Sequence, residues 1–418
     1  MLPPGFKMSD TPIPPKGRGP LAKREARLAW GLLAPTIISV SLVVILPLLA
    51  IFWISVKPIG LADLRPPTLS VNEQLRDADE AEPYIRYRVR NTSQDIALTS
   101  ARFSDMFPEG AEPGAVPEGC TYEARTLTCD LGEVEAGGRS EIRVPIIADD
   151  PEAMEDPLED SEPDVVVKAP NILTNFEFTG ENFARVFDGG EFWQVLWVTL
   201  LYTIFGTIGA LVMGLFAAML LNKSFRGQGI LRGLYLFPYV APVIAVAFTW
   251  VTLFDPFSGS ANALLIQMGV TSEAINFFGQ RPLALIMVIV FEIWRYFPLS
   301  FLFILARMQS IDTDMYEAAD MDGASPFQKF WYLSLPQLVG ILSVLFLLRF
   351  IWTFNKFDDI FLLTGGNAGT RTLTVNVYEQ AFAISNIGAG AAVAVVIFAC
   401  LIVFSVFFFK WISREEGL

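Results

Sequence analysis

The chain has 418 residues, of which 53% are hydrophobic and 13% aromatic, and its mean hydropathy is +0.45. This is too apolar for an ordinary soluble domain and indicates a polytopic membrane protein. The formal charge of −14 comes from one segment, because residues 60–165 hold 25 acidic and 9 basic side chains. The rest of the chain is roughly neutral, without the basic footprint of a nucleic-acid-binding protein.

Several classes of chemistry are excluded by residues that the sequence lacks. There is no histidine, which excludes histidine-based acid–base catalysis and histidine-ligated metal sites. There is no G-x-x-x-x-G-K-[ST] phosphate loop, so we expect no ATP hydrolysis and no cofactor in this chain. Cys400 lies in an apolar run and is expected to be a buried structural residue. Cys120 and Cys129 could form a disulfide if their segment faces an oxidising compartment.

Membrane spans follow a polar, basic N-terminal tail at residues 1–27. Residues 28–56 carry no charge, and this run is longer than the core of a signal peptide, so it predicts a retained first span. Six predicted spans place both termini on one side of the membrane. The other five are predicted at 193–221, 233–254, 282–306, 332–354 and 388–409.

The distribution of Lys and Arg predicts the orientation of these spans. The N-terminal tail, the loops at 222–232 and 307–331, and the C-terminal tail carry most of the basic residues near the spans. The short loop at 255–281 has only Arg281. The positive-inside rule therefore places both termini in the cytoplasm and residues 57–190 outside.

The outside segment is long enough for a domain of its own. In PYIRYRVRNTS, Ile85, Tyr87 and Val89 alternate with arginines, and RSEIRVPIIA repeats the alternation. This pattern is typical of half-buried strands and predicts a small antiparallel β-sandwich at about 82–148. Residues 149–164 read as an acidic linker, since their prolines and missing loop glycine disfavour a calcium site. Asn91–Ser93, Gly119–Cys120 and Leu127–Gly132 resemble a bacterial β-sandwich repeat of the DUF11 type.

A capped, charged unit interrupts the apolar pattern at residues 310–336. Asp314 followed by Glu317 predicts the start of a short helix, which Gly323 ends in the left-handed conformation. Ser325, Pro326 and Gln328 then predict the capped start of a second helix, and Pro336 starts the next span. Two consecutive caps around a glycine specify a shape, which an ordinary surface loop does not require.

This unit closely resembles the EAA loop of ABC importer permeases. The motif is filled by Glu317-Ala318-Ala319, Asp322-Gly323-Ala324 and Leu335-Pro336. From about residue 28 to the C-terminus, outside the insert, the chain resembles the maltose/glycerol-phosphate group of carbohydrate permeases. One departure is Ile311-Asp312, where the family often has Ile-Pro. The supporting stretches are LLAPTIISV, GLFAAMLLNKSFRGQGILRGLYLFPYVAPVIA, FDPFSGSANALL and FNKFDDIFLLTGGN with TRTLTVNVYEQAF.

The resemblance implies an all-α fold of six transmembrane helices, the type I ABC importer permease fold, with the β-sandwich as an extracytoplasmic insert. It also implies that the EAA loop couples to a cytoplasmic ATPase subunit. The implied partners are a second related permease, two ATPase subunits that bind ATP and Mg²⁺, and an extracytoplasmic sugar-binding protein. The residues implied in coupling are Glu317, Ala318, Ala319, Asp322, Gly323, Ala324 and Pro336.

Charges inside predicted spans are the other candidate functional residues. Glu292, Arg295 and Arg349 are costly in a membrane, so they mark either a structural ion pair or a polar translocation path. Aromatic side chains nearby could stack on a sugar or could simply pack. The resemblance implies a sugar site at Glu292, Arg295, Tyr296, Leu299, Arg349, Trp352 and Thr353.

The predicted function is therefore that of a permease subunit of an ATP-driven importer for a di- or oligosaccharide or a glucoside-like solute. An ion-coupled secondary transporter, with Glu292 as a proton carrier, is one alternative. A membrane-anchored sensor or adhesion protein that uses the β-domain is another. Charged residues at the implied sugar site leave the identity of the solute open.

Overall fold

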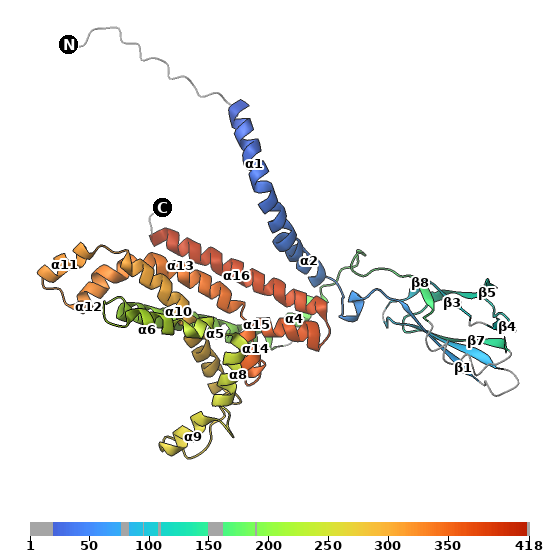
Figure 1. Cartoon of the computed structure of the whole chain (residues 1–418). Helices are drawn as coiled ribbons and strands as arrows, with labels where there is room; N and C mark the ends of the chain where they lie inside the picture. Colours follow the sequence, from blue (N-terminus) through green and yellow to red (C-terminus); the bar gives the residue numbers. More distant parts are fainter. Residues whose placement is uncertain are drawn as a thin grey trace, which may run out of the picture. The chain divides into compact units, whose positions relative to one another are not determined.

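The computed structural model describes residues 20–76, 83–94, 96–107, 110–148, 162–188 and 190–415. It divides into two units, residues 1–53 and 54–418, and each is described by itself. Most of the tail predicted at 1–27 lies outside the described residues. The described part of the first unit, from Pro20 onward, is one long and mostly apolar helix (Figure 1). It consists of α1 (Pro20–Val40), a π-helical turn (Ser41–Ile45) and the start of α2 (Leu46–Ser55).

The second unit contains a helical membrane core. Together with the first helix, the described residues contain five helices long and apolar enough to cross a membrane, and a sixth span if one bent pair is counted. The bent pair joins residues 228–240 to 243–253 at an angle of 89°. The core helices are α4 (Glu181–Asp188), α5 (Phe192–Leu221), α6 (Gln228–Tyr235), α7 (Phe237–Val240), α8 (Val243–Leu253), α9 (Ser260–Gln267), α10 (Leu283–Gln309), α11 (Thr313–Met321), α12 (Pro326–Lys329), α13 (Leu335–Phe354), α14 (Asp358–Thr364), α15 (Leu373–Tyr378) and α16 (Ile387–Glu415).

A stripe of small residues brings α5 against α10. Gly206, Ala210, Gly214 and Ala218 recur every four residues on α5, and all four are buried. A Cβ atom on Gly214 would lie 2.8 Å from the backbone nitrogen of Phe301 on α10. Without a hydrophobic driving force between helices in lipid, such small residues let two backbones approach and pack. The stripe therefore determines the spacing of α5 and α10.

The insert is a β-sandwich of two four-stranded sheets. One sheet has the order β1-β2-β7-β4 and the other β5-β6-β3-β8, and all neighbouring strands among the described residues are antiparallel. The fold class predicted from the sequence, a helical membrane protein with a β-sandwich insert, is confirmed. The strands are β1 (Leu69–Arg76), β2 (Tyr84–Asn91), β3 (Leu98–Met106), β4 (Ala111–Pro113), β5 (Cys120–Glu123), β6 (Thr126–Val134), β7 (Arg139–Ala148) and β8 (Asp164–Lys168).

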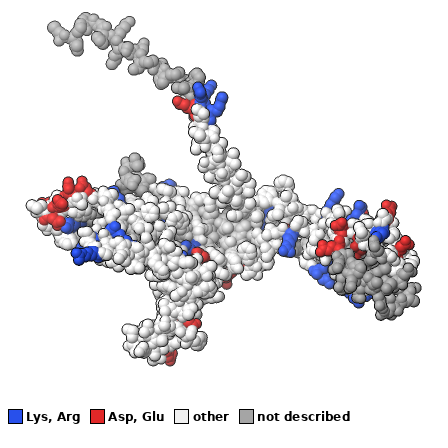
Figure 2. Space-filling model, viewed as in Figure 1, with Lys and Arg blue, Asp and Glu red and all other residues white. Residues whose placement is uncertain are grey.

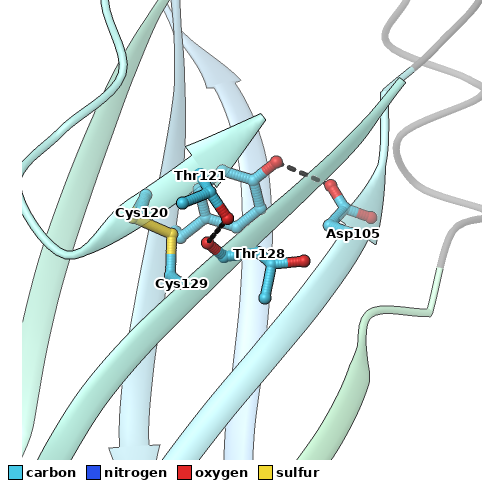
Figure 3. Close-up of a disulfide and its surroundings, with 6 residues drawn as sticks. Asp105, Cys120, Thr121, Thr128 and Cys129 are labelled. Atoms are coloured by element: carbon cyan, nitrogen blue, oxygen red, sulfur yellow. Dashed lines mark hydrogen bonds between the residues drawn. A yellow bond between two sulfur atoms is a disulfide. The ribbon is translucent and has the colours of Figure 1, made fainter. Parts of the chain in front are cut away.

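The predicted alternation in β2 is present in the sandwich. Ile85, Tyr87 and Val89 are at most 2% exposed, while the arginines between them face away from the core. Cys120 and Cys129 are paired directly across β5 and β6 and form a disulfide (Figure 3). Residues far apart in the sequence meet in this core, because the two sheets bury their inner faces against each other. The buried members are Leu69, Ile85, Tyr87, Val89, Leu98, Ala101, Phe103, Phe107, Ala111, Leu127, Cys129, Val144 and Ile146.

The sandwich is larger than the predicted 82–148. β1 precedes this range and pairs with β2, while β8 follows the range and pairs with β3. Residues 149–161 of the predicted acidic linker lie outside the described residues, and Asp164 begins β8. The alternation in the sequence did not reveal β1 and β8, because β8 is only five residues long and β1 carries the charged Glu73 at an inward position.

The base of the insert is fastened to the helical core by polar contacts. Asn182 of α4 donates hydrogen bonds to the carbonyl oxygens of Ser55 and Lys57, at 2.9 and 2.7 Å. The Leu61 amide donates to the Ser385 carbonyl at 2.8 Å, and the Gly388 amide donates to Ile59 at 2.9 Å. The connection that leaves α2 is therefore held against the beginning of α16.

Candidate functional site

A buried ion pair connects α10 and α13. Nη2 of Arg349 donates to Oε1 of Glu292 at 2.8 Å, and the two side chains are 3% and 1% exposed. Oε1 also accepts from the Thr353 hydroxyl at 3.0 Å. Oε2 accepts from the Tyr202 hydroxyl of α5 at 3.0 Å. The carboxylate thus joins three membrane helices, and both of its oxygens have donors.

The geometry around this pair reduces the cost of burying two charges. Removing water from an ion is expensive, and the attraction between partners compensates only when the remaining lone pairs are also satisfied. Glu292 meets this condition through Thr353 and Tyr202. Arg349 makes a further bond from Nη1 to the carbonyl of Tyr296, at 3.2 Å. The pair therefore binds the helices to one another, and loss of either partner would leave a buried charge.

The ring of Tyr296 lies among three cationic groups. The guanidinium carbons of Arg295 and Arg349 are 5.5 and 5.3 Å from its centroid. Lys356 Nζ is 4.1 Å from the centroid and donates to the Tyr296 hydroxyl at 2.6 Å. Tyr239 contacts the ring edge to face, with centroids 6.1 Å apart. Aromatic rings attract cations through their electron-rich faces, so Tyr296 organises this charged cluster.

Arg295 donates hydrogen bonds to backbone carbonyls at the break in the bent span. Its Nη1 donates to the Pro238 carbonyl at 3.1 Å, and Nη2 donates to the Ala241 carbonyl at 3.0 Å. Pro242 has no amide hydrogen, and the helix bends there by 89°. Backbone groups freed at membrane depth need internal partners, because lipid supplies none. The guanidinium of Arg295, 6% exposed, is such a partner and holds the bend in place.

The residues implied in the sugar site fall into two groups. Glu292, Arg349 and Thr353 are bonded to one another, while Tyr296 and Arg295 lie beside them. Leu299 is half-buried one turn farther along α10. Trp352 is 54% exposed and belongs to no part of the cluster. The structure therefore brings together the three charged residues predicted inside spans, Glu292, Arg295 and Arg349.

Tyr202 and Asp359 were missed by the sequence analysis. Tyr202 lies in an uncharged run, but Thr199, Thr203 and Gly206 form a polar or small stripe with it at helical spacing. That stripe is a signal for a buried interface. A Cβ on Gly206 would lie 2.8 Å from Cγ of Glu292, so this glycine admits the carboxylate. Asp359 is fully buried, and its nearest cationic group in the described part of the chain is Lys356 Nζ, at 4.0 Å.

The EAA loop forms the predicted pair of short helices at one end of the core (Figure 1). Ser325 and Gln328 make the expected capping box, with bonds of 2.8 and 3.3 Å. Gly323 has φ +74° and ends the first helix as expected. The prediction for the first cap was wrong, because Asp312, not Asp314, caps α11. Asp312 is the residue that replaces the family's proline, and its carboxylate accepts from the Asp314 amide at 3.1 Å.

Internal contacts hold the loop against the start of α13. The Tyr316 hydroxyl is 2.9 Å from the Ser334 hydroxyl. Lys329 pairs with Asp320 at 2.5 Å. Glu317 and Ala318 point into solvent, with Asp322 and Gly323 also exposed. Figure 2 shows acidic side chains gathered at this end of the molecule. Pro336 lies in the first turn of α13, where its missing amide costs no helix bond.

This architecture, with a bent span, a buried polar cluster and an exposed pair of short helices, is that of a membrane permease. Residues 210–416 match the family of binding-protein-dependent transport system inner membrane components. The chain is 37% identical over 238 residues to the inner membrane ABC transporter permease protein YcjO of Escherichia coli, covering 57% of this chain and 79% of that protein. The chain belongs to this family of ABC transporter permeases and is a multi-pass inner-membrane protein.

Other similar proteins fit the same assignment. The chain is 32% identical over 230 residues to the trehalose/maltose transport system permease protein MalF of Thermococcus litoralis, covering 55% of this chain and 77% of that protein. A crystal structure of a bacterial ABC transporter involved in import of the acidic polysaccharide alginate matches with TM-score 0.53 at 20% identity. That match covers 58% of this chain and 85% of the other, and it supports the fold.

Proposed function

We propose that this chain is the permease subunit of an ATP-driven importer of a carbohydrate, a di- or oligosaccharide or a glucoside-like solute. The observation that carries the proposal is the capped, solvent-exposed EAA loop at one end of the helical membrane core. The trehalose/maltose permease among its relatives supports the solute class. The chain lacks a phosphate loop, so ATP and Mg²⁺ would be bound by separate ATPase subunits.

The surface of the EAA loop supports docking to an ATPase subunit. Met321, Phe327 and Tyr332 are 89%, 71% and 76% exposed and lie on or beside the two short helices. Large apolar side chains gathered on a surface mark an interaction site. We place Glu317 and Ala318 toward the ATPase. Two ATPase subunits would bind, one to this chain and one to a second, related permease.

The polar cluster supports a solute path beside Tyr296. Glu292, Arg349 and Thr353 satisfy one another, so their role in this proposal is to position the path. Tyr296 and Leu299 are half-buried and are the groups that we assign to solute contact. An aromatic ring offers a flat apolar surface, and the nearby Lys356 offers hydrogen-bond donors to sugar hydroxyls. Trp352, on the outer side of α13, is assigned to a contact with the second permease.

The orientation of the chain is part of the proposal. The basic loops and tails favour a cytoplasmic location of both termini, and the β-sandwich would then lie outside. An extracytoplasmic sugar-binding protein would deliver the solute from that side. ATP binding would close the ATPase dimer and move the solute site from outward- to inward-facing through the EAA loop.

The test is uptake by the assembled transporter in proteoliposomes, with a panel of glycosides and the cognate binding protein. Glu317→Lys and Gly323→Pro should reduce ATP-driven uptake and co-purification of the ATPase, while the chain still inserts. Gly340→Ala is the matched control, because no atom lies within 4 Å of the added Cβ. Uptake by this chain alone without ATP would contradict the proposal and support a secondary transporter.

A further inference from the structure

One face of the β-sandwich is strongly basic, although the chain as a whole carries a charge of −14. The outward side chains of β1, β2 and β7 include six arginines, which we call the arginine face. Among the described residues, the outer face of this sheet carries two acidic side chains, Glu141 of β7 and Glu112 of β4. The arginine face consists of Arg76, Arg86, Arg88, Arg90, Arg139 and Arg143.

The strand register concentrates these charges instead of pairing them. Arg86 is directly opposite Arg143, and Arg90 is directly opposite Arg139. Like charges opposite each other in a sheet destabilise it. Only Arg88 has an acid opposite, Glu141, and the hydrogen bond of Glu141 goes to Arg143 at 2.8 Å. The two facing arginine pairs are unfavourable for the sheet, which indicates a use outside the fold.

Three of the arginines are available to an external anion. Arg88, Arg90 and Arg139 are exposed, and no ion pair or hydrogen bond of their side chains occurs within the described part of the chain. Arg76 and Arg86 donate to one uncharged acceptor, the Gln74 side-chain oxygen, at 2.8 and 2.6 Å. The planar guanidinium groups suit the oxygens of a phosphate.

An apolar rim borders the same face. Ile147 of β7 is 68% exposed, and Pro145 and Tyr84 point outward beside it. The guanidinium of Arg143 lies 5.5 Å from the centre of the Tyr84 ring. Arginine with tyrosine and isoleucine is the composition of surfaces that rest in the headgroup layer of a bilayer. An acidic protein surface would match the arginines but would leave Ile147 without an apolar contact.

The chain keeps the sandwich close to a membrane. The hydrogen bonds from the Leu61 amide to Ser385 and from the Gly388 amide to Ile59 attach the connection at the beginning of α16, a candidate span. Residues 62–68 are all that separate this attachment from β1. Seven residues reach at most about 25 Å when fully extended. A bilayer surface is therefore at a high effective concentration for this domain.

We propose that the arginine face docks on anionic phospholipid headgroups of the bilayer in which the chain is embedded. The phosphates occupy Arg88, Arg90 and Arg139, and Tyr84 with Ile147 enters the headgroup layer. This interaction holds the sandwich against the membrane and is independent of the solute and of ATP. Each arginine near an anionic surface contributes about a five-fold factor in affinity.

The test uses the full chain in lipid nanodiscs. A fluorophore is attached to Ser70→Cys in a Cys400→Ser background, because Ser70 is exposed and directly opposite Arg90. A nitroxide on the lipid headgroup quenches the fluorophore on contact. We expect strong quenching in discs that contain phosphatidylglycerol and weak quenching in phosphatidylcholine alone. High salt should also weaken it, because it screens exposed charges. A label at Val166→Cys, outward on the other sheet, should stay unquenched.

Charge variants separate this docking from a general effect. The triple change Arg88→Gln, Arg90→Gln and Arg139→Gln should weaken docking by about 100-fold. The matching lysine triple keeps the positive charge and should retain most of the docking. This result would also show that the sandwich still folds with three substitutions on this face. The control triple Arg65→Gln, Arg102→Gln and Arg185→Gln removes the same charge from exposed sites off the face. Equal quenching in both lipids, or equal losses from both glutamine triples, would overturn the proposal. The proposal would also be overturned if the Arg88, Arg90 and Arg139 glutamine triple showed full quenching but impaired capture of the binding protein.

Discussion

Glu292 and Arg349 form an ion pair of 2.8 Å between α10 and α13, with both side chains at most 3% exposed. Tyr202 adds a third helix through the second oxygen of the same carboxylate. Charges buried in a membrane need such partners, so the pair is first a connection between helices. Any movement of α13 against α10 during transport has to preserve this bond or replace it.

Breaking the pair from one side should be strongly destabilising. Arg349→Met or Glu292→Met alone is expected to cost about 3–5 kcal/mol, because the remaining charge is left unpaired. The double variant should recover much of this loss. Thermal unfolding in detergent, followed as a double-mutant cycle, measures the coupling. Additive losses in the double variant would contradict the assignment.

The glycine at the turn of the EAA loop is needed for its backbone conformation. Gly323 has φ +74°, and no atom lies within 4 Å of an added Cβ. Gly323→Ala is therefore expected to cost about 1–2 kcal/mol of left-handed strain, without a clash. Gly323→Asn should be milder, since asparagine tolerates this conformation better. ATP-driven uptake should decrease in the order glycine, asparagine, alanine, and the reverse order for the last two would argue against backbone strain as the cause.

Gly214 is needed for a different reason, the close approach of α5 and α10. An added Cβ would lie 2.8 Å from the Phe301 backbone nitrogen and 2.7 Å from Cβ of Ser300. Since backbone cannot move aside cheaply, Gly214→Ala should separate the helices and cost about 1–3 kcal/mol. Gly340→Ala on α13 meets no neighbour and should be neutral or slightly stabilising. Equal melting temperatures of the two variants in detergent would contradict this account.

The β-sandwich should lose stability as pH rises. Burial, followed by the hydrogen bond and negative charge of Asp105, raises the pKa of Glu73 to about 9. The folded state therefore binds a proton that the unfolded state releases above a pH of about 4.3. The stabilisation is full below that value and is lost as pH rises toward 9. Hydrogen exchange of β1–β3 should accelerate over this window.

Glu73→Gln should remove most of that pH dependence, because the amide cannot ionise. Glu141→Gln is a control of opposite sign, since the hydrogen bond from Arg143 lowers the pKa of Glu141. Its small contribution is present at neutral pH and is lost in acid. The hydrogen exchange of the Glu73→Gln protein is compared with that of the wild type across the titration window, from about pH 5 to about pH 9. If the two pH profiles are the same, the buried carboxyl is not the cause.

The disulfide should stabilise the sandwich without being required for its topology. Closing the loop between Cys120 and Cys129 removes chain entropy worth about 2–3 kcal/mol. Replacing both by serine should lower the unfolding free energy of the domain by about that amount. Cys400→Ser, in α16, should leave the domain unchanged. Loss of all exchange protection in the double serine variant would show that the hydrophobic core of the sandwich is insufficient by itself.

Much of the fold could be predicted because local patterns carry it. Apolar runs of about 20 residues predict spans, and alternation in β2 predicts a strand whose inner face is buried. The capping box at Ser325 and the turn at Gly323 were also predictable, since caps and left-handed glycines act within four residues. The cap of α11 was predicted at Asp314 but is Asp312, two residues earlier, because both acids were compatible with the local pattern.

The sequence by itself determined that this is a membrane permease with a β-sandwich insert and an EAA loop, because hydrophobic runs and short-range caps are properties of neighbouring residues. Only the tertiary structure decided what the intramembrane charges do. Glu292 and Arg349 are 57 positions apart, and Arg295 meets the carbonyl of Pro238 from a different helix. Their partners depend on how helices pack, and helix packing depends on contacts such as Gly214 against Phe301 that no local pattern specifies.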